Sequence, residues 1–214
     1  FNNDPLQEAS FNPMPGIVHK YQGRALLIAA GHCAINCRYC FRRHYPYGDQ
    51  KRARSEWQQS LSYIEQHPDI EEIILSGGDP LALTDPQLFE LITAIEAIPH
   101  IKRLRIHSRL PIVLPQRITL KLCQRLERCR LTCVMVLHAN HANELAEDVA
   151  QACTRLRKHK VHLLNQSVLL AQVNDNLASL KELSERLFDL GVTPYYLHLP
   201  DHVAGTTHFF VSLE

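Results

Sequence analysis

Six short runs of aliphatic and β-branched residues alternate with five amphipathic helical patterns, and this alternation limits the folds open to the chain. The stretches between runs are long enough for crossover helices, which favour parallel pairing of the strands. A helix-covered parallel α/β sheet is therefore predicted, either open and doubly wound or an incomplete barrel, and periodicity alone does not separate the two. The predicted strands are 25–30, 72–76, 103–107, 132–138, 163–169 and 194–199, and the predicted helices cover about 55–66, 85–97, 116–128, 143–158 and 176–190.

Local signals support several helix ends. Thr84 and Gln87 have the spacing of a capping box at the start of the second predicted helix. Gly191 suits the position that follows the end of the fifth helix. The basic stretch 155–160 is typical of a solvated helix C-terminus, which the helix dipole favours.

Length and composition fit one domain with one substantial core, since the chain has 214 residues of which 45% are hydrophobic. Residues 1–23, with three prolines, are expected to form an irregular N-terminal lead-in, and residues 24–214 the α/β core. No run has transmembrane length and no signal peptide is recognisable. The balance of 23 basic against 22 acidic residues gives no electrostatic case for a nucleic-acid or membrane partner.

Three cysteines, Cys33, Cys37 and Cys40, follow the first predicted strand with the spacing C-x3-C-x2-C. Thiolates are the usual ligands of iron–sulfur clusters, and a cubane cluster normally takes four, so three would leave one iron open to a non-protein ligand. The alternatives are three unrelated cysteines or a zinc site with a distant fourth ligand. The other four of the seven cysteines have no ligand-like spacing, and Cys123 and Cys153 are expected in the core. This usage fits a reducing cytoplasm better than a disulfide framework.

A second motif, Ser76-Gly77-Gly78-Asp79, ends the second predicted strand. Paired glycines at such a place allow close approach of the backbone to a ligand, and Asp79 could bind a cation. A plain tight turn is the alternative. Sites of barrel enzymes are built at the C-terminal ends of strands, where both motifs are predicted to lie.

Together the two motifs resemble the radical SAM superfamily. The resemblance implies a partial (β/α)6 barrel and a 4Fe–4S cluster on the three cysteines. It also implies S-adenosylmethionine bound to the open iron and cleaved, after a one-electron transfer, to a 5′-deoxyadenosyl radical. The glycine motif, Ser76 to Asp79, would hold the methionyl amino group of that cofactor.

Further runs resemble lysine 2,3-aminomutases over nearly the whole chain, from Asp4 to Phe209. Within that family, the sequence from Cys37 to His44 and the sequence from Leu197 to Gly205 are most similar to the branch that serves β-lysylation of elongation factor P. The resemblance implies a 1,2-amino shift that makes (R)-β-lysine from (S)-α-lysine, with pyridoxal phosphate as a further cofactor. An external reductant would supply the electron, and a partner ligase would attach the product to elongation factor P.

The resemblance also assigns binding residues. Arg42 would grip the substrate carboxylate, because a guanidinium fork is bidentate and always charged. Asp201 would bind the side-chain ammonium of lysine, which needs a counter-charge once desolvated. A surface arginine and a solvated turn residue are the respective alternatives.

His138 and Gln166, at predicted strands, would lie near S-adenosylmethionine, although a strand-end histidine is often a hydrogen-bonded core residue. Tyr21 and Arg24 would lie near pyridoxal phosphate, and an arginine suits a phosphate.

One departure affects the assignment. The family holds pyridoxal phosphate on a lysine in a glycine-rich segment far downstream of the last strand, and this chain ends at Glu214 without a match, so no catalytic residue is assigned. Either the C-terminal pyridoxal phosphate segment is missing from this chain, or the protein does not hold that cofactor covalently. A lysine-catabolic aminomutase and another radical SAM enzyme remain alternatives. A non-catalytic iron–sulfur electron carrier or redox sensor is a more distant one. The sequence leaves the reductant and the oligomeric state open, a homo-oligomer included.

Overall fold

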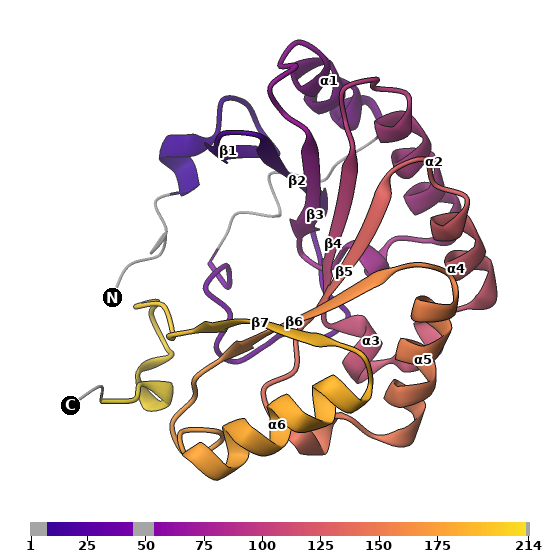
Figure 1. The fold of residues 1–214 in the computed structure, drawn as a ribbon. Coiled ribbons are helices and arrows are strands. Elements are labelled where there is room, and N and C mark those ends of the chain that lie inside the picture. The colour runs from indigo at the N-terminus through magenta and orange to yellow at the C-terminus, as the bar shows by residue number, and fades with distance from the viewer. Residues whose placement is uncertain (1–7, 45–53, 213–214) are drawn as a thin grey trace.

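The structure is a computed structural model that describes residues 8–44 and 54–212 (Figure 1). Seven strands form one sheet whose spatial order follows the chain, with β1 and β7 at its edges. β1 pairs antiparallel with β2, and each later pair of neighbours is parallel. The strands are β1 (Ile17–Tyr21), β2 (Arg24–Ala30), β3 (Glu72–Gly77), β4 (Arg103–Ser108), β5 (Thr132–Leu137), β6 (His162–Val168) and β7 (Thr193–His198).

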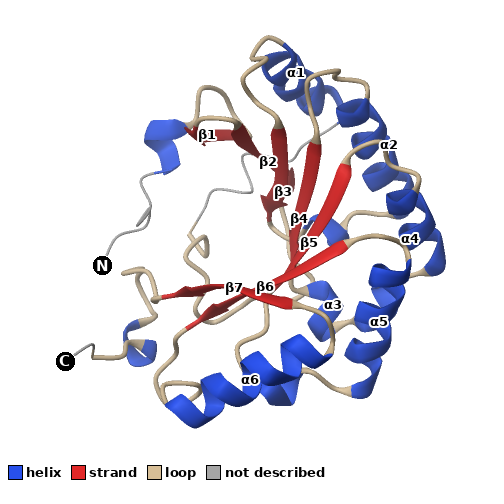
Figure 2. Ribbon diagram, viewed as in Figure 1, coloured by secondary structure: helices blue, strands red, loops and turns tan. Residues whose placement is uncertain are grey.

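The helices lie along the outside of this curved sheet, as Figure 2 shows. Because they cover one face, the fold is an incomplete barrel with parallel strands and not a doubly wound sheet, which carries helices on both faces. The helices are α1 (Arg54–Glu65), α2 (Asp85–Glu96), α3 (Leu110–Val113), α4 (Leu120–Glu127), α5 (Glu147–Lys158) and α6 (Leu177–Asp189).

The two faces of the sheet differ in chemistry. Along β4, Leu104 and Ile106 are fully buried and belong to the apolar core beneath the helices. The alternate residues Arg105 and His107 lie on the other side, which we call the inner face, because successive side chains of a strand point to opposite faces. Polar and charged side chains therefore collect on the inner face.

The predicted strands and helix ends are largely confirmed. Gln87 Oε1 accepts a hydrogen bond from Thr84 N at 3.1 Å, so the capping box forms. Gly191 has a φ of 68° and follows Leu190, the C-cap of α6, which is the position predicted for it. Cys123 and Cys153 lie in the core as expected.

The structure corrects the expectation of an irregular lead-in over residues 1–23. Its first seven residues lie outside the described part, but Ile17–Tyr21 forms β1, which turns back through Gly23 to pair with β2. The strand was not predicted because Pro13 and Pro15, which are typical of irregular segments, lie just before it.

Two helices begin later than predicted, each for a local reason. Residues 115–117 form a 3-10 turn, and Thr119 caps α4 by accepting from Leu122 N at 3.1 Å. Before α5, a 3-10 turn over residues 142–144 is capped by His141.

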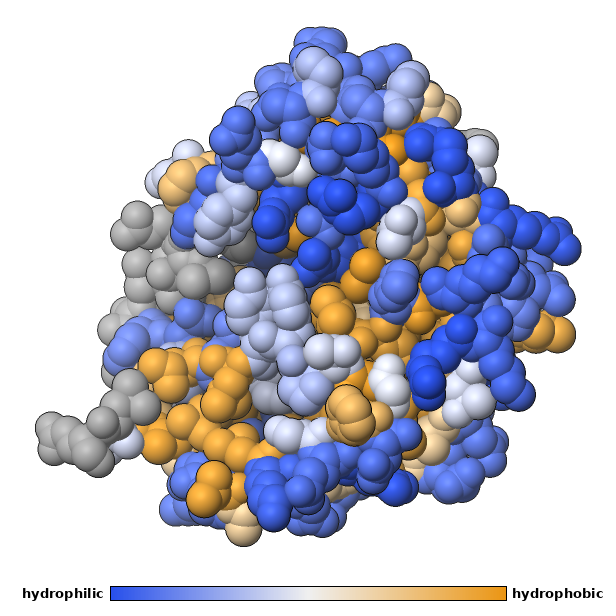
Figure 3. Space-filling view, viewed as in Figure 1, coloured by the Kyte–Doolittle hydropathy of each residue, from blue (hydrophilic) through white to orange (hydrophobic). Residues whose placement is uncertain are grey.

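Apolar side chains gather in Figure 3 over the end of β7 and the segment that follows it, where Leu197 and Leu199 are about half exposed. Among the described residues, no helix is long and apolar enough to cross a membrane.

Candidate functional site at the ends of the parallel strands

The three cysteines of the C-x3-C-x2-C motif lie in the loop that leaves β2, which we call the cysteine loop (residues 31–44). All three thiols are free. Loss of hydration, followed by the negative charge of Asp79, Cys40 and Cys37, raises the pKa of Cys33 to about 12. Within the described residues, no three His, Cys, Asp or Glu side chains are gathered closely enough to hold a metal ion. The thiols have the number and chemistry of cluster ligands, but their side chains are not arranged as ligands in this structure.

The glycine motif packs directly against the start of the cysteine loop. Gly78 N donates to Ala30 O at 2.8 Å, and Asp79 N donates to His32 O at 2.9 Å. A Cβ atom added to Gly78 would lie 2.1 Å from His32 O, and one added to Gly77 would lie 2.8 Å from Ala30 O. Contact between two backbones therefore requires glycine at both positions.

The side chain of Asp79 stabilises the turn that makes this contact. Its buried carboxylate accepts hydrogen bonds from Ser108 Oγ at 2.7 Å, Arg109 N at 2.9 Å and Leu81 N at 3.0 Å. Burial raises the pKa of Asp79, and these hydrogen bonds oppose that rise. The side chain thus ties β3 to the end of β4. The contact with S-adenosylmethionine predicted for Asp79 stays a prediction.

Arg42 joins the other end of the cysteine loop to the same strand. Its side chain is buried, and Nη1 donates to Ser76 Oγ at 3.0 Å. The guanidinium also lies over the Phe41 ring, 4.8 Å from the centroid. Arg42 and Ser76, predicted separately as substrate and cofactor residues, are therefore in contact.

Two histidines lie at the C-terminal ends of neighbouring strands: His107 is the penultimate residue of β4, and His138 directly follows β5. The Nε2 atoms of His107 and His138 are buried and have no hydrogen-bond partner in the part of the chain that the structure describes. Their rings are 5.8 Å apart in an edge-to-face arrangement. Burial lowers the pKa of His138 to about 3 and that of His107 well below its usual value, so both imidazoles are neutral at pH 7. His138 was predicted as a site residue. His107 was not, although its place on the inner face of a predicted strand could have indicated it.

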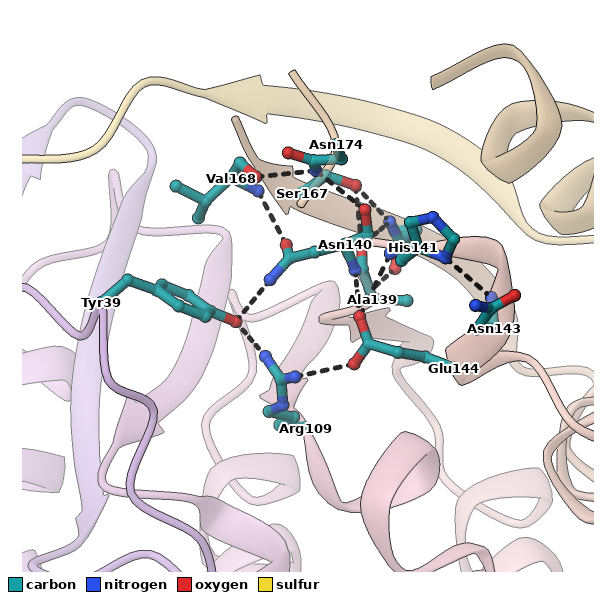
Figure 4. A network of polar contacts seen from close by, with 11 residues as sticks. Tyr39, Arg109, Ala139, Asn140, His141, Asn143, Glu144, Ser167, Val168 and Asn174 are labelled. Carbon is teal, nitrogen blue, oxygen red and sulfur yellow. Dashed lines mark hydrogen bonds and ion pairs between the residues drawn. The ribbon is translucent and has the colours of Figure 1, made fainter. Parts of the chain in front are cut away.

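A polar network also missed by sequence reasoning fixes the cysteine loop to β4 and β5 (Figure 4). The Tyr39 hydroxyl, inside the cysteine motif, accepts from Asn140 Nδ2 at 2.8 Å and from Arg109. Arg109 pairs with Glu144 at 2.7 Å, and Glu144 accepts from Asn140 N at 2.7 Å. Nothing in the local sequence pattern indicates these partners, because they come from three separate loops.

The remaining predicted residues are spread more widely. Gln166 is half-buried on β6. Asp201 follows β7 and lies near His198: burial lowers the pKa of His198, and the negative charge of Asp201 opposes this change. Tyr21 and Arg24 are exposed and face each other across β1 and β2. Arg24 pairs in register with Glu72 at the opposite end of β3 from Ser76, about 13 Å along the strand at roughly 3.3 Å per residue. The structure thus separates the two residues predicted for pyridoxal phosphate from those at the C-terminal ends of the strands.

Comparison with known proteins places this arrangement in a family. The family model described as the radical SAM superfamily matches residues 27–195, which span every parallel strand except the first residues of β2 and the end of β7. The chain therefore belongs to the radical SAM superfamily.

Its curated relatives are more specific. The chain is 55% identical over 212 residues to the L-lysine 2,3-aminomutase of Escherichia coli K12, covering 99% of this chain and 62% of that protein. It is 53% identical to the Haemophilus influenzae protein of the same name, covering 63% of it. The Clostridium subterminale L-lysine 2,3-aminomutase is 39% identical, with half of its length covered. The chain thus spans less than two thirds of the length of these relatives.

Solved structures agree on the fold. A structure of anSMEcpe with bound AdoMet superposes with a TM-score of 0.60 at 11% identity, covering 82% of this chain and 50% of that one. A radical SAM methyltransferase from Sphaerobacter thermophilus gives a TM-score of 0.51 at 18% identity, covering 86% and 57%.

Proposed function

We propose that this protein is a radical SAM aminomutase that converts (S)-α-lysine to (R)-β-lysine by a 1,2-amino shift. The observation that carries the proposal is the meeting of Arg42, the glycine motif and the cysteine loop in a chain 55% identical to an L-lysine 2,3-aminomutase. The identity supports lysine as substrate, and the position of Arg42 supports a ligand that carries a carboxylate.

In this proposal Cys33, Cys37 and Cys40 hold a 4Fe–4S cluster with one open iron. Ser76, Gly77, Gly78, His138 and Gln166 line the place of S-adenosylmethionine, with Asp79 positioning the glycine turn. When bound, the cluster and S-adenosylmethionine supply one-electron, hydrogen-abstracting chemistry, and pyridoxal phosphate supplies an acceptor for the migrating nitrogen. The unpartnered Nε2 of His138 fits a bound ligand, because buried polar atoms in folded proteins are nearly always hydrogen-bonded.

The chain's own residues bind and orient the substrate. Arg42 holds the carboxylate with its fork, which Ser76 keeps in place. Asp201 neutralises the side-chain ammonium, which selects lysine over an apolar amino acid. For pyridoxal phosphate, Arg24 beside Tyr21 offers a guanidinium to the phosphate. Because Arg24 lies about 13 Å along the sheet from Ser76, at roughly 3.3 Å per residue, the cofactor and the bound lysine together would have to span that distance.

We assign the β-lysine product to the modification of elongation factor P in the cytoplasm, through a partner lysyl ligase. An external reductant would supply the electron. Deleting the gene and weighing elongation factor P by mass spectrometry tests this role: loss of the β-lysyl mass increment supports it, and an unchanged mass contradicts it.

The activity itself is tested on full-length protein, reconstituted anaerobically with iron, sulfide and both organic cofactors and reduced with dithionite. We expect β-lysine from α-lysine, and a loss of kcat/KM of about thirtyfold or more in Asp201→Asn, because an ammonium then lacks its counter-charge. Asp175→Asn is the matched control, since the Asp175 carboxylate accepts only a turn hydrogen bond from Gln172 N at 2.9 Å among the contacts described. Formation of 5′-deoxyadenosine without β-lysine would contradict the lysine assignment.

A further inference from the structure

His107 presents a buried nitrogen that the fold does not use. Its Nε2 has no hydrogen-bond partner among the described residues. Burying a polar atom without a partner is unfavourable, so such an atom in a folded protein calls for an explanation. A bound ligand would explain the unpartnered Nε2 atom, because this atom lies beside the candidate site.

The register of the sheet defines this neighbourhood. Leu75 pairs with Ile106, so the next residues, Ser76 and His107, adjoin each other on the inner faces of β3 and β4. Ser76 is the residue that Arg42 contacts at 3.0 Å. His107 therefore lies one strand away from the guanidinium that we propose binds a carboxylate.

The charges around His107 also favour an anionic ligand. The groups that act on the pKa of His107 are His138, Arg105, Arg42 and His198. Of these, Arg105 and Arg42 carry a permanent positive charge, whereas His138 is neutral at pH 7. Arg105 is already paired with the Glu72 carboxylate at 2.7 Å. A neutral imidazole here can still donate a hydrogen bond, without adding a further cation to this cluster.

We propose that His107 is a binding residue that donates from Nε2 to an α-amino-acid carboxylate held by Arg42. A carboxylate has two oxygens with about four acceptor positions, so a guanidinium fork leaves room for a second donor. This chemistry occurs in two ligands of the proposed reaction, the substrate lysine and the methionyl part of S-adenosylmethionine. The inference rests on the proposed function for the first ligand, but not for the second.

The test compares His107→Phe, which keeps a planar ring and removes the donor, with the wild type by equilibrium binding. Full-length reconstituted protein is titrated separately with lysine, with lysinamide and with S-adenosylmethionine. His107→Gln, which keeps an N–H donor, is the conservative variant and guards against a folding defect in the first. His162→Phe is the matched control, because His162 is an exposed histidine at the N-terminal end of β6, two strands away from β4.

If lysine is the ligand, His107→Phe raises the Kd of lysine about tenfold or more and changes that of lysinamide less than twofold, since a hydrogen bond to a charged group is lost. If S-adenosylmethionine is the ligand, its Kd rises instead and that of lysine does not. Either result supports the proposal, provided that His107→Gln restores part of the affinity and His162→Phe has no effect. Kd values within twofold of wild type for both ligands would overturn it. Failure of the wild type to bind lysine would reject the proposed substrate, while the titration with S-adenosylmethionine would still decide the role of His107.

Discussion

At the scale of single residues, the site is built from buried polar groups whose partners come from distant parts of the chain. Tyr39 shows this clearly, because its hydroxyl joins the cysteine loop to Asn140 after β5 and to Arg109 after β4. Burial raises the pKa of Tyr39, so the hydroxyl stays protonated and can still accept from both neighbours. Tyr39 therefore fixes the cysteine loop to the ends of both strands.

Tyr39→Phe should therefore lower the free energy of unfolding by about 1–3 kcal/mol, because two buried donors lose their shared acceptor. Urea denaturation measures this. Tyr63→Phe is the control, since that hydroxyl bonds to His19 at 2.9 Å outside the network, and its loss should be smaller. Equal losses in the two variants would contradict the account of the network.

Sequence reasoning identified these residues unevenly. The cysteines and the glycine motif were singled out from their spacing and place after strands, and Arg42 and His138 from the family resemblance. The structure places Arg42 and His138 at the C-terminal ends of the strands, and their ligand-binding roles stay predictions. Arg109 and Glu144 were not assigned, since their pairing spans more than 30 residues and periodicity does not contain it. His107 was not assigned either, although its place on the inner face of a predicted strand could have indicated it.

At the scale of elements, the site depends on how the end of β3 meets the loop after β2. Hydrogen bonds from Gly78 and Asp79 to that loop leave no space for a side chain at Gly78. The six parallel strands were predictable because each is a short run with aliphatic residues between two helical patterns, continuous in β2 and β5 and alternating in β4. β1 was not, since it is short, lies at an edge and follows two prolines.

Gly78→Ala tests this contact. The added methyl group would overlap the backbone of His32, so the cysteine loop must shift. Because this shift moves the cysteines, the iron bound per protein after reconstitution should fall about twofold or more. Gly23→Ala is the control. The nearest atom to its added Cβ would be Asp69 O at 3.9 Å, and its φ of 81° strains the turn between β1 and β2 instead, far from the cysteines. Full iron content in Gly78→Ala would show that the loop does not depend on this contact.

At the scale of the whole molecule, an incomplete barrel puts its apolar core between sheet and helices and leaves the inner face to polar chemistry. The C-terminal ends of the strands then bring together the cysteine loop, Arg42 and the two histidines, as expected for enzymes built on β/α units. Length and alternation predicted this architecture, but the choice of a barrel over an open sheet came from the family resemblance.

The central claim is that the three cysteines hold a cluster with an iron left open for S-adenosylmethionine. The most direct measurement is the EPR spectrum of anaerobically reconstituted, dithionite-reduced full-length protein, recorded before and after S-adenosylmethionine is added. We predict a reduced 4Fe–4S signal that changes on addition of the cofactor and is absent in Cys37→Ala. A cluster signal that S-adenosylmethionine leaves unchanged would contradict the claim and favour an electron carrier or redox sensor.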